Sequence, residues 1–61
     1  MTYQPPQRIH ITSDDSEVIF VRKEKELYVY RYTKGIEKVG TEVKWTQAEI
    51  EKQLTNYFKV V

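Results

Sequence analysis

The sequence predicts a small α+β domain, an antiparallel β-meander of three to four strands with one C-terminal α-helix packed on one face. Two observations carry this prediction. Short runs of β-branched and aromatic residues are separated by turn residues in the first two thirds of the chain, which is typical of strands. The last third combines a helix-start signature with an apolar stripe of helical spacing. At 61 residues the chain can form only one domain.

The N-terminal half is expected to form an arm and two strands. Pro5 and Pro6 lack amide donors and favour extended geometry, so residues 1–7 are predicted to be an extended arm before a domain at residues 8–61. RIHIT then reads as a first strand, and the SDDS that follows it as a turn. The next segment, EVIFVRK, is rich in β-branched residues and predicts a second strand.

Two short hairpin loops set the expected register. A two-residue loop at Glu24–Lys25 would place Ile19 opposite Tyr30, and one at Lys34–Gly35 would place Tyr30 opposite Val39 and Thr33 opposite Ile36. The first loop lacks the usual Asn or Gly and can be longer.

The C-terminal helix is predicted from about Gln47 to Phe58. Thr46 and Glu49 have the spacing of a capping box, and Trp45 and Ile50 that of a hydrophobic staple. Four apolar residues then fall at i, i+4, i+7 and i+8: Ile50, Leu54, Tyr57 and Phe58.

In this register the strands present two different faces. One face holds Ile19, Val21, Tyr28, Tyr30, Tyr32, Val39, Thr41 and Val43. The other holds Val18, Phe20, Arg22, Leu27, Val29, Arg31, Ile36, Lys38 and Gly40. Since the tyrosine face carries no basic residue, we expect it to pack beneath the helix, although a slip of one residue would exchange the two faces.

The second face is therefore the candidate binding surface. It has an apolar centre of Phe20 and Val29 and a basic rim of Arg22, Arg31 and Lys38. Arg31 would face Lys38, a like-charge pair that needs solvent or an anion to stabilise it. One helix leaves such a face uncovered, which indicates a partner.

Composition narrows the function mostly by exclusion. There is no cysteine and one histidine, His10, so neither a nucleophile–base pair nor a zinc site is expected, and we predict no enzyme activity, metal or cofactor. No small-molecule substrate is inferred. No apolar run approaches the roughly 20 residues of a membrane span, and no secretory signal is recognisable. A cytoplasmic protein without membrane contact is the default expectation.

The charge distribution leaves two functions open. Residues 20–45 hold seven basic against four acidic residues, although the whole chain has a net charge of only +1. We favour a small protein-binding or regulatory module that binds a larger protein and forms a homodimer. The alternative is binding of single-stranded DNA or RNA on the same face, with cations on phosphates and Phe20 stacking on a base.

Part of the chain resembles a known family of nucleic-acid-binding proteins. Val21-Arg22, Arg31-Tyr32 and the passage TEVKWTQAEIEKQL are similar to segments of the single-stranded-DNA-binding transcriptional coactivators called positive cofactor four, over about residues 18–54. The connection before the helix is shorter here than that family's pattern. The resemblance implies dimerisation, and DNA contacts first at Arg22 and Arg31.

Overall fold

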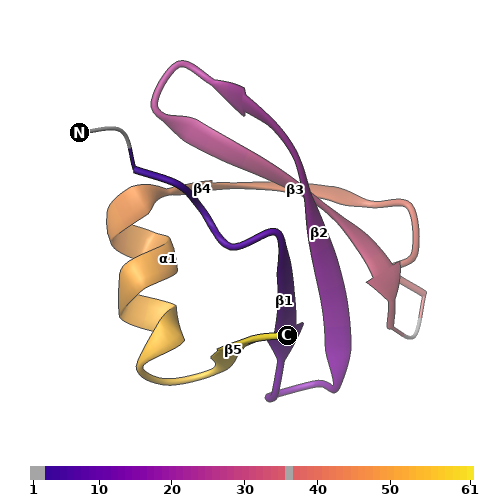
Figure 1. Ribbon diagram of the computed structural model, residues 1–61. Coiled ribbons are helices and arrows are strands. Elements are labelled where there is room, and N and C mark those ends of the chain that lie inside the picture. Colours follow the sequence, from indigo (N-terminus) through magenta and orange to yellow (C-terminus); the bar gives the residue numbers. More distant parts are fainter. Residues whose placement is uncertain (1–2, 36) are drawn as a thin grey trace.

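The computed structural model describes residues 3–35 and 37–61, which form an antiparallel five-stranded sheet and one helix (Figure 1). The sheet order is β4-β3-β2-β1-β5, so β4 and β5 are its two edges. The elements are β1 (Arg8–Ile11), β2 (Ser16–Glu24), β3 (Leu27–Lys34), β4 (Glu42–Thr46), α1 (Gln47–Leu54) and β5 (Phe58–Val60). The predicted α+β class is confirmed, and a fifth strand follows the helix.

The sheet is strongly twisted, and α1 connects its two edges. In Figure 1, the long β2–β3 hairpin crosses the direction of β4, and α1 lies on one side of the sheet between the end of β4 and the start of β5. Both edge strands contact α1. Within the part of the chain that the structure describes, no helix has the length and apolar character needed to span a membrane.

The core lies between this helix and the tyrosine face, as predicted. Tyr30 and Ile50 are fully buried and Tyr28 nearly so. They belong to one apolar cluster, completed by Ile9, Ile11, Val18 and Phe58, with Phe20, Tyr32, Val43 and Trp45 packed against it. Burial of these side chains is the main favourable term in folding.

Both predicted hairpin registers are wrong. In the first hairpin Glu24 pairs with Leu27, so the loop is Lys25–Glu26, and Lys25 takes a positive φ of 55°. A bulge between Phe20 and Arg22 then places Phe20 opposite Tyr30, where Ile19 was expected. Phe20 therefore lies on the tyrosine face, and Ile19 moves to the opposite face, across from Arg31.

The second connection is longer than two residues. It runs from residue 35 to residue 41, and Tyr30 pairs with Val43 where Val39 was predicted. Positive φ angles at Gly35 (145°), Glu37 (59°) and Gly40 (90°) show how the chain turns there. Val39 is 66% exposed in this loop. Ile36 lies outside the described residues, so its predicted pairing with Thr33 stays a prediction.

The helix begins where predicted and ends four residues early. The Thr46 side chain accepts a hydrogen bond from the Glu49 amide, and the Glu49 carboxylate accepts one from the Thr46 amide, which confirms the capping box. The C-cap is Thr55. Beyond it Phe58 reaches the core from β5, while Tyr57 is 53% exposed.

The N-terminal arm is docked on the core from Tyr3 onwards. The rings of Tyr3 and Tyr28 meet edge to face at 5.4 Å, and the Tyr30 hydroxyl donates a 2.6 Å hydrogen bond to the Pro6 carbonyl. Burial raises the pKa of the Tyr3 hydroxyl, with a further contribution from the charge of Glu51. The arm thus closes the core above the tyrosine face.

Candidate functional site

The face of the sheet opposite the helix carries a connected set of ion pairs. Glu42 accepts bonds from Arg22 Nη2 (3.1 Å) and Arg31 Nη2 (2.9 Å), and Glu24 pairs with Arg22 Nε (2.6 Å) and Lys44 Nζ (3.0 Å). We call this the outer-face network: Arg22, Glu24, Arg31, Glu42 and Lys44. Three cations and two anions leave it a single positive charge.

These pairs shift the pKa values of the two acids. The guanidinium of Arg22, and after it that of Arg31, lowers the pKa of Glu42. Arg22 and then Lys44 lower the pKa of Glu24. The same contacts raise the pKa of Arg22. Exposed ion pairs contribute little to stability individually, but here they occupy the cations that were expected to meet a ligand.

The structure separates the five predicted binding residues. Phe20 is on the opposite, helix-covered face, where its ring lies 5.6 Å from that of Tyr30. Val29 does share the outer face with Arg22 and Arg31, but it is 0% exposed between Arg22 and Lys44, its register partners. The aliphatic stems of such long side chains cover apolar neighbours. The predicted apolar centre is therefore absent from this face.

Lys38 lies away from the sheet face. It sits in the 35–41 loop and bonds the carboxylate of Asp14, in the turn between β1 and β2. Arg31 faces Glu42, so the predicted Arg31–Lys38 like-charge pair is wrong. The bond to Lys38, and secondly that to Ser16, lowers the pKa of Asp14. Asp14 in turn raises the pKa of Lys38.

Lys38 instead borders a cleft that sequence analysis missed. Its walls come from four aromatic side chains and from α1, which contributes Glu49 and Gln53, and its volume is about 320 Å³. We call it the aromatic cleft, lined by Asp14, Tyr32, Lys38, Trp45, Glu49, Gln53, Tyr57 and Phe58, together with Ile11 and Ser13. The Trp45 and Phe58 rings lie 4.9 Å apart, and Lys38 Nζ is 5.5 Å from the centre of the Tyr32 ring.

Two features distinguish the aromatic cleft. The Tyr57 ring is half exposed, so apolar surface remains open there. Gln53 Oε1 is buried without a hydrogen-bond partner among residues 3–35 and 37–61. An acceptor left in this state costs about 1–3 kcal/mol.

A signal for this cleft was present in the sequence. FKVV after Tyr57 is β-branched and aromatic, which favours a strand over a continued helix. A strand there turns Phe58 into the core and leaves Tyr57 at the opening. The partners Asp14 and Lys38 could not be found in this way, because they meet only through the geometry of two loops.

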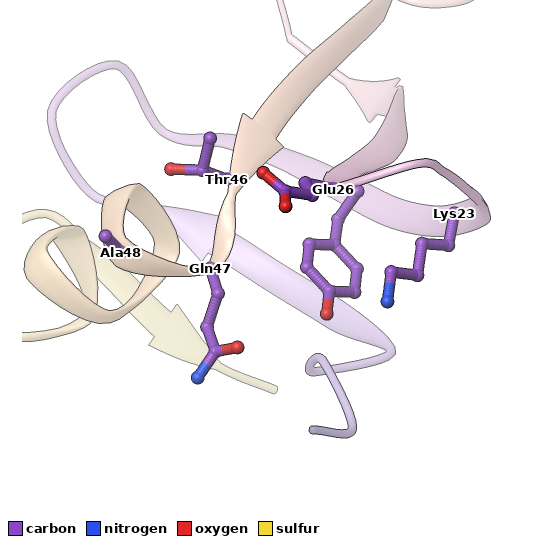
Figure 2. Close-up of a pocket in the computed structure, with 6 residues that line it drawn as sticks. Lys23, Glu26, Thr46, Gln47 and Ala48 are labelled. Carbon is purple, nitrogen blue, oxygen red and sulfur yellow. The ribbon is translucent and has the colours of Figure 1, made fainter. Parts of the chain in front are cut away.

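Figure 2 shows another cleft, between the β2–β3 turn and the start of α1. Lys23, Glu26, Thr46, Gln47 and Ala48 line it together with Tyr28, and Lys23 Nζ lies 5.4 Å from the centre of the Tyr28 ring. Lys23 and Glu26 carry opposite charges, so this cleft has no net charge with which to select an ion.

The acidic turn after β1 makes contacts within the protein. Asp15 lies 3.2 Å from His10 Nε2, and Asp14 accepts a 2.6 Å bond from Ser16 Oγ. Among the described residues, no group of three or more histidine, aspartate or glutamate side chains is arranged to hold a metal ion.

No protein-family model matches the chain, and neither a curated protein nor a solved structure matches it. The resemblance to positive cofactor four therefore receives no support from these comparisons.

Proposed function

We propose that this chain is a non-enzymatic protein-binding module whose aromatic cleft receives an extended segment of a partner protein. The observation that carries the proposal is the gathering of four aromatic rings from three strands and a loop around one opening, with Tyr57 half exposed. Aromatic side chains are enriched at the centres of protein interfaces, where they provide large, rigid apolar contacts.

The size of the cleft favours one anchoring side chain of a larger partner. About 320 Å³ is at the lower end of the 300–1,000 Å³ typical of small-molecule sites. A segment with a large apolar side chain would fill the space between Trp45 and Tyr57.

The charges around the cleft favour a neutral or basic segment. Asp14 and Glu49 outnumber Lys38 among the charged lining residues, which leaves one negative charge. A nucleic-acid strand would bring phosphates toward this excess. On the outer face, Arg22 and Arg31 already bond Glu42, so fewer free cations are available for phosphate contacts. Both observations support a protein partner over nucleic acid.

The test is selection of binding peptides from a random displayed library, followed by titration. Trp45 is the only tryptophan in the sequence and lines the cleft, so its fluorescence reports occupancy. We expect an enriched peptide to shift this fluorescence, to bind at least about tenfold more weakly to Tyr57→Ala, and to show little salt dependence. Val39→Ala, which changes an exposed apolar side chain outside the cleft, is the matched control.

Two results would contradict the proposal. One is equal peptide affinity for Tyr57→Ala and the unsubstituted protein, because the cleft would then be irrelevant to binding. The other is absence of peptide binding together with oligonucleotide binding that weakens steeply with salt and is lost in Arg31→Ala. That outcome would favour the nucleic-acid alternative on the outer face.

A further inference from the structure

The two edges of the sheet differ in which main-chain groups they leave free. At β5, the Thr12 amide donates to the Tyr57 carbonyl (2.7 Å) and the Val61 amide donates to the Arg8 carbonyl (3.2 Å). Main-chain direction alternates along a strand, so Tyr57, Lys59 and Val61 face β1. The N–H and C=O groups of Phe58 and Val60 consequently point to the free edge.

The side chains at this edge are apolar and exposed. Val60 is 62% exposed and Val61 65%. Together with Tyr57, they supply three of the four large apolar residues that are mostly exposed in the described structure; the fourth is Val39. Edge strands that are not meant to pair usually carry charges, prolines or bulges. In β5 only Lys59 is charged.

The other edge is protected in the expected way. The Tyr32 amide donates to the Thr41 carbonyl (2.9 Å), so the outward-facing main-chain groups of β4 belong to Glu42, Lys44 and Thr46. Glu42 and Lys44 carry charged side chains held in the outer-face network. The Thr46 amide is bonded to Glu49 Oε1 at 3.0 Å. β4 is therefore a poor template for another strand, whereas β5 is a good one.

We propose that the free edge of β5 pairs antiparallel with β5 of a second copy of this chain, with the two-fold axis at Val60. Val60 then exchanges two main-chain hydrogen bonds with Val60 of the second copy, and the two exposed Val60 side chains cover one another. Lys59 lies opposite Val61 of the second copy. A two-fold axis at Lys59 would place two lysines directly opposite each other, which is destabilising.

Self-association also suits the size and charge of the protein. A 61-residue domain without a disulfide has a small core, and joining two sheets adds buried apolar surface and satisfies free edge groups. A net charge of +1 gives little repulsion between copies. Because the shared edge is short, we expect a dimer that dissociates on dilution. Val60, on which the pairing is centred, does not line the aromatic cleft.

The test is sedimentation equilibrium of the whole chain across a concentration series, with two substitutions at Val60. Val60→Pro removes only an outward amide and is tolerated at an edge strand, so it should abolish the dimer without unfolding the protein. Val60→Lys places two lysines opposite each other and should raise the dimer dissociation constant at least about tenfold. Val39→Lys adds the same charge at an exposed valine outside the sheet and should leave the dimer dissociation constant unchanged.

Amide hydrogen exchange gives a second readout that depends on strand geometry. As concentration rises, the Val60 amide should gain protection, while the Lys59 amide, which already faces β1, should not change. A protein that stays monomeric up to about millimolar concentration overturns the proposal. A dimer that persists in Val60→Pro, or that Val39→Lys weakens as much as Val60→Lys does, also overturns it. Circular dichroism confirms that each variant is folded.

Discussion

The Tyr30 hydroxyl donates a 2.6 Å hydrogen bond to the carbonyl of Pro6, 24 residues earlier in the chain. Tyr30 is fully buried, and Pro6 belongs to the arm that closes the core. Desolvation of the hydroxyl strongly raises the pKa of Tyr30 above its usual value near 10. This bond joins the arm to the centre of the sheet, and the burial of the same hydroxyl makes the stability of the fold depend on pH.

The burial of the Tyr30 hydroxyl predicts a loss of stability at alkaline pH. Above about pH 10 the unfolded chain releases the Tyr30 proton, while the folded chain keeps it because its pKa is raised. The stabilisation is complete below pH 10 and declines as pH rises toward the folded pKa, by up to about 1.4 kcal/mol per pH unit. Urea unfolding between pH 7 and pH 11 measures it.

Tyr30→Phe separates this effect from general alkaline damage. It leaves the Pro6 carbonyl without its donor and should cost about 1–3 kcal/mol at pH 7. The substitution also removes the proton that the unfolded chain releases at alkaline pH. The difference in the free energy of unfolding between Tyr30→Phe and the unsubstituted protein should therefore shrink above about pH 10. Tyr57→Phe, at an exposed position, should leave stability at pH 7 unchanged. A constant difference at every pH would contradict the assignment to Tyr30.

The outer-face network predicts a specific coupling between Arg31 and Glu42. Arg22, and after it Arg31, lowers the pKa of Glu42 in the folded protein. The network's contribution to stability is therefore present above about pH 4.3, the usual pKa of a glutamate in the unfolded chain, and is lost as pH falls through the lower pKa of the folded state. Arg31→Ala should move the Glu42 pKa part of the way back, because Arg22 remains. Carboxyl titration by nuclear magnetic resonance measures this, with Arg8→Ala as the control. An unchanged Glu42 pKa in Arg31→Ala would show that the pair does not form in solution.

Sequence patterns predicted the elements of this fold better than their register. The alternation of Tyr28, Tyr30 and Tyr32 correctly placed the core beneath the helix, because side-chain direction alternates whatever strand lies beside it. Register depends on turn geometry. Lys25 adopts a positive φ, which a sequence usually signals with glycine or asparagine, so the position of this turn could not be predicted. The bulge at Val21 then carried Phe20 from the predicted site to the core face.

The predicted binding site is wrong for a related reason, the length of the loop after β3. Arg31 and Lys38 were paired by assuming a two-residue loop at Gly35, but the loop continues to residue 41 and brings Lys38 to Asp14. Tyr57 and Phe58 have helical spacing from Ile50, so periodicity alone assigned them to the helix. The helix stops at Leu54, near where Asn56 Nδ2 donates to the Lys52 carbonyl, and this local bond is not visible as a pattern.

The stability of the start of α1 depends on the Thr46 hydroxyl, which is part of the capping box. Thr46→Ala removes the hydroxyl that accepts the Glu49 amide and should lower the free energy of unfolding by about 1 kcal/mol. Thr46→Ser keeps that hydroxyl and is the matched control, expected to remain within about 0.5 kcal/mol of the unsubstituted protein. Thermal and urea unfolding measure both. Equal losses in the two variants would mean that the threonine methyl group, and not the cap, stabilises this end of the helix.

Ile50 is the only residue of α1 that is fully buried, so it should dominate the attachment of the helix to the sheet. Truncating a buried isoleucine costs about 2–5 kcal/mol, and a domain of this length is expected to have only about 3–9 kcal/mol in total. Ile50→Ala should therefore be largely unfolded or close to it at 37 °C, as measured by circular dichroism. Leu54→Ala, at a half-buried position on the same helix, should lose clearly less stability than Ile50→Ala. If the two variants were equally stable, α1 would not be held mainly through Ile50, and the packing between helix and sheet described above would be incorrect.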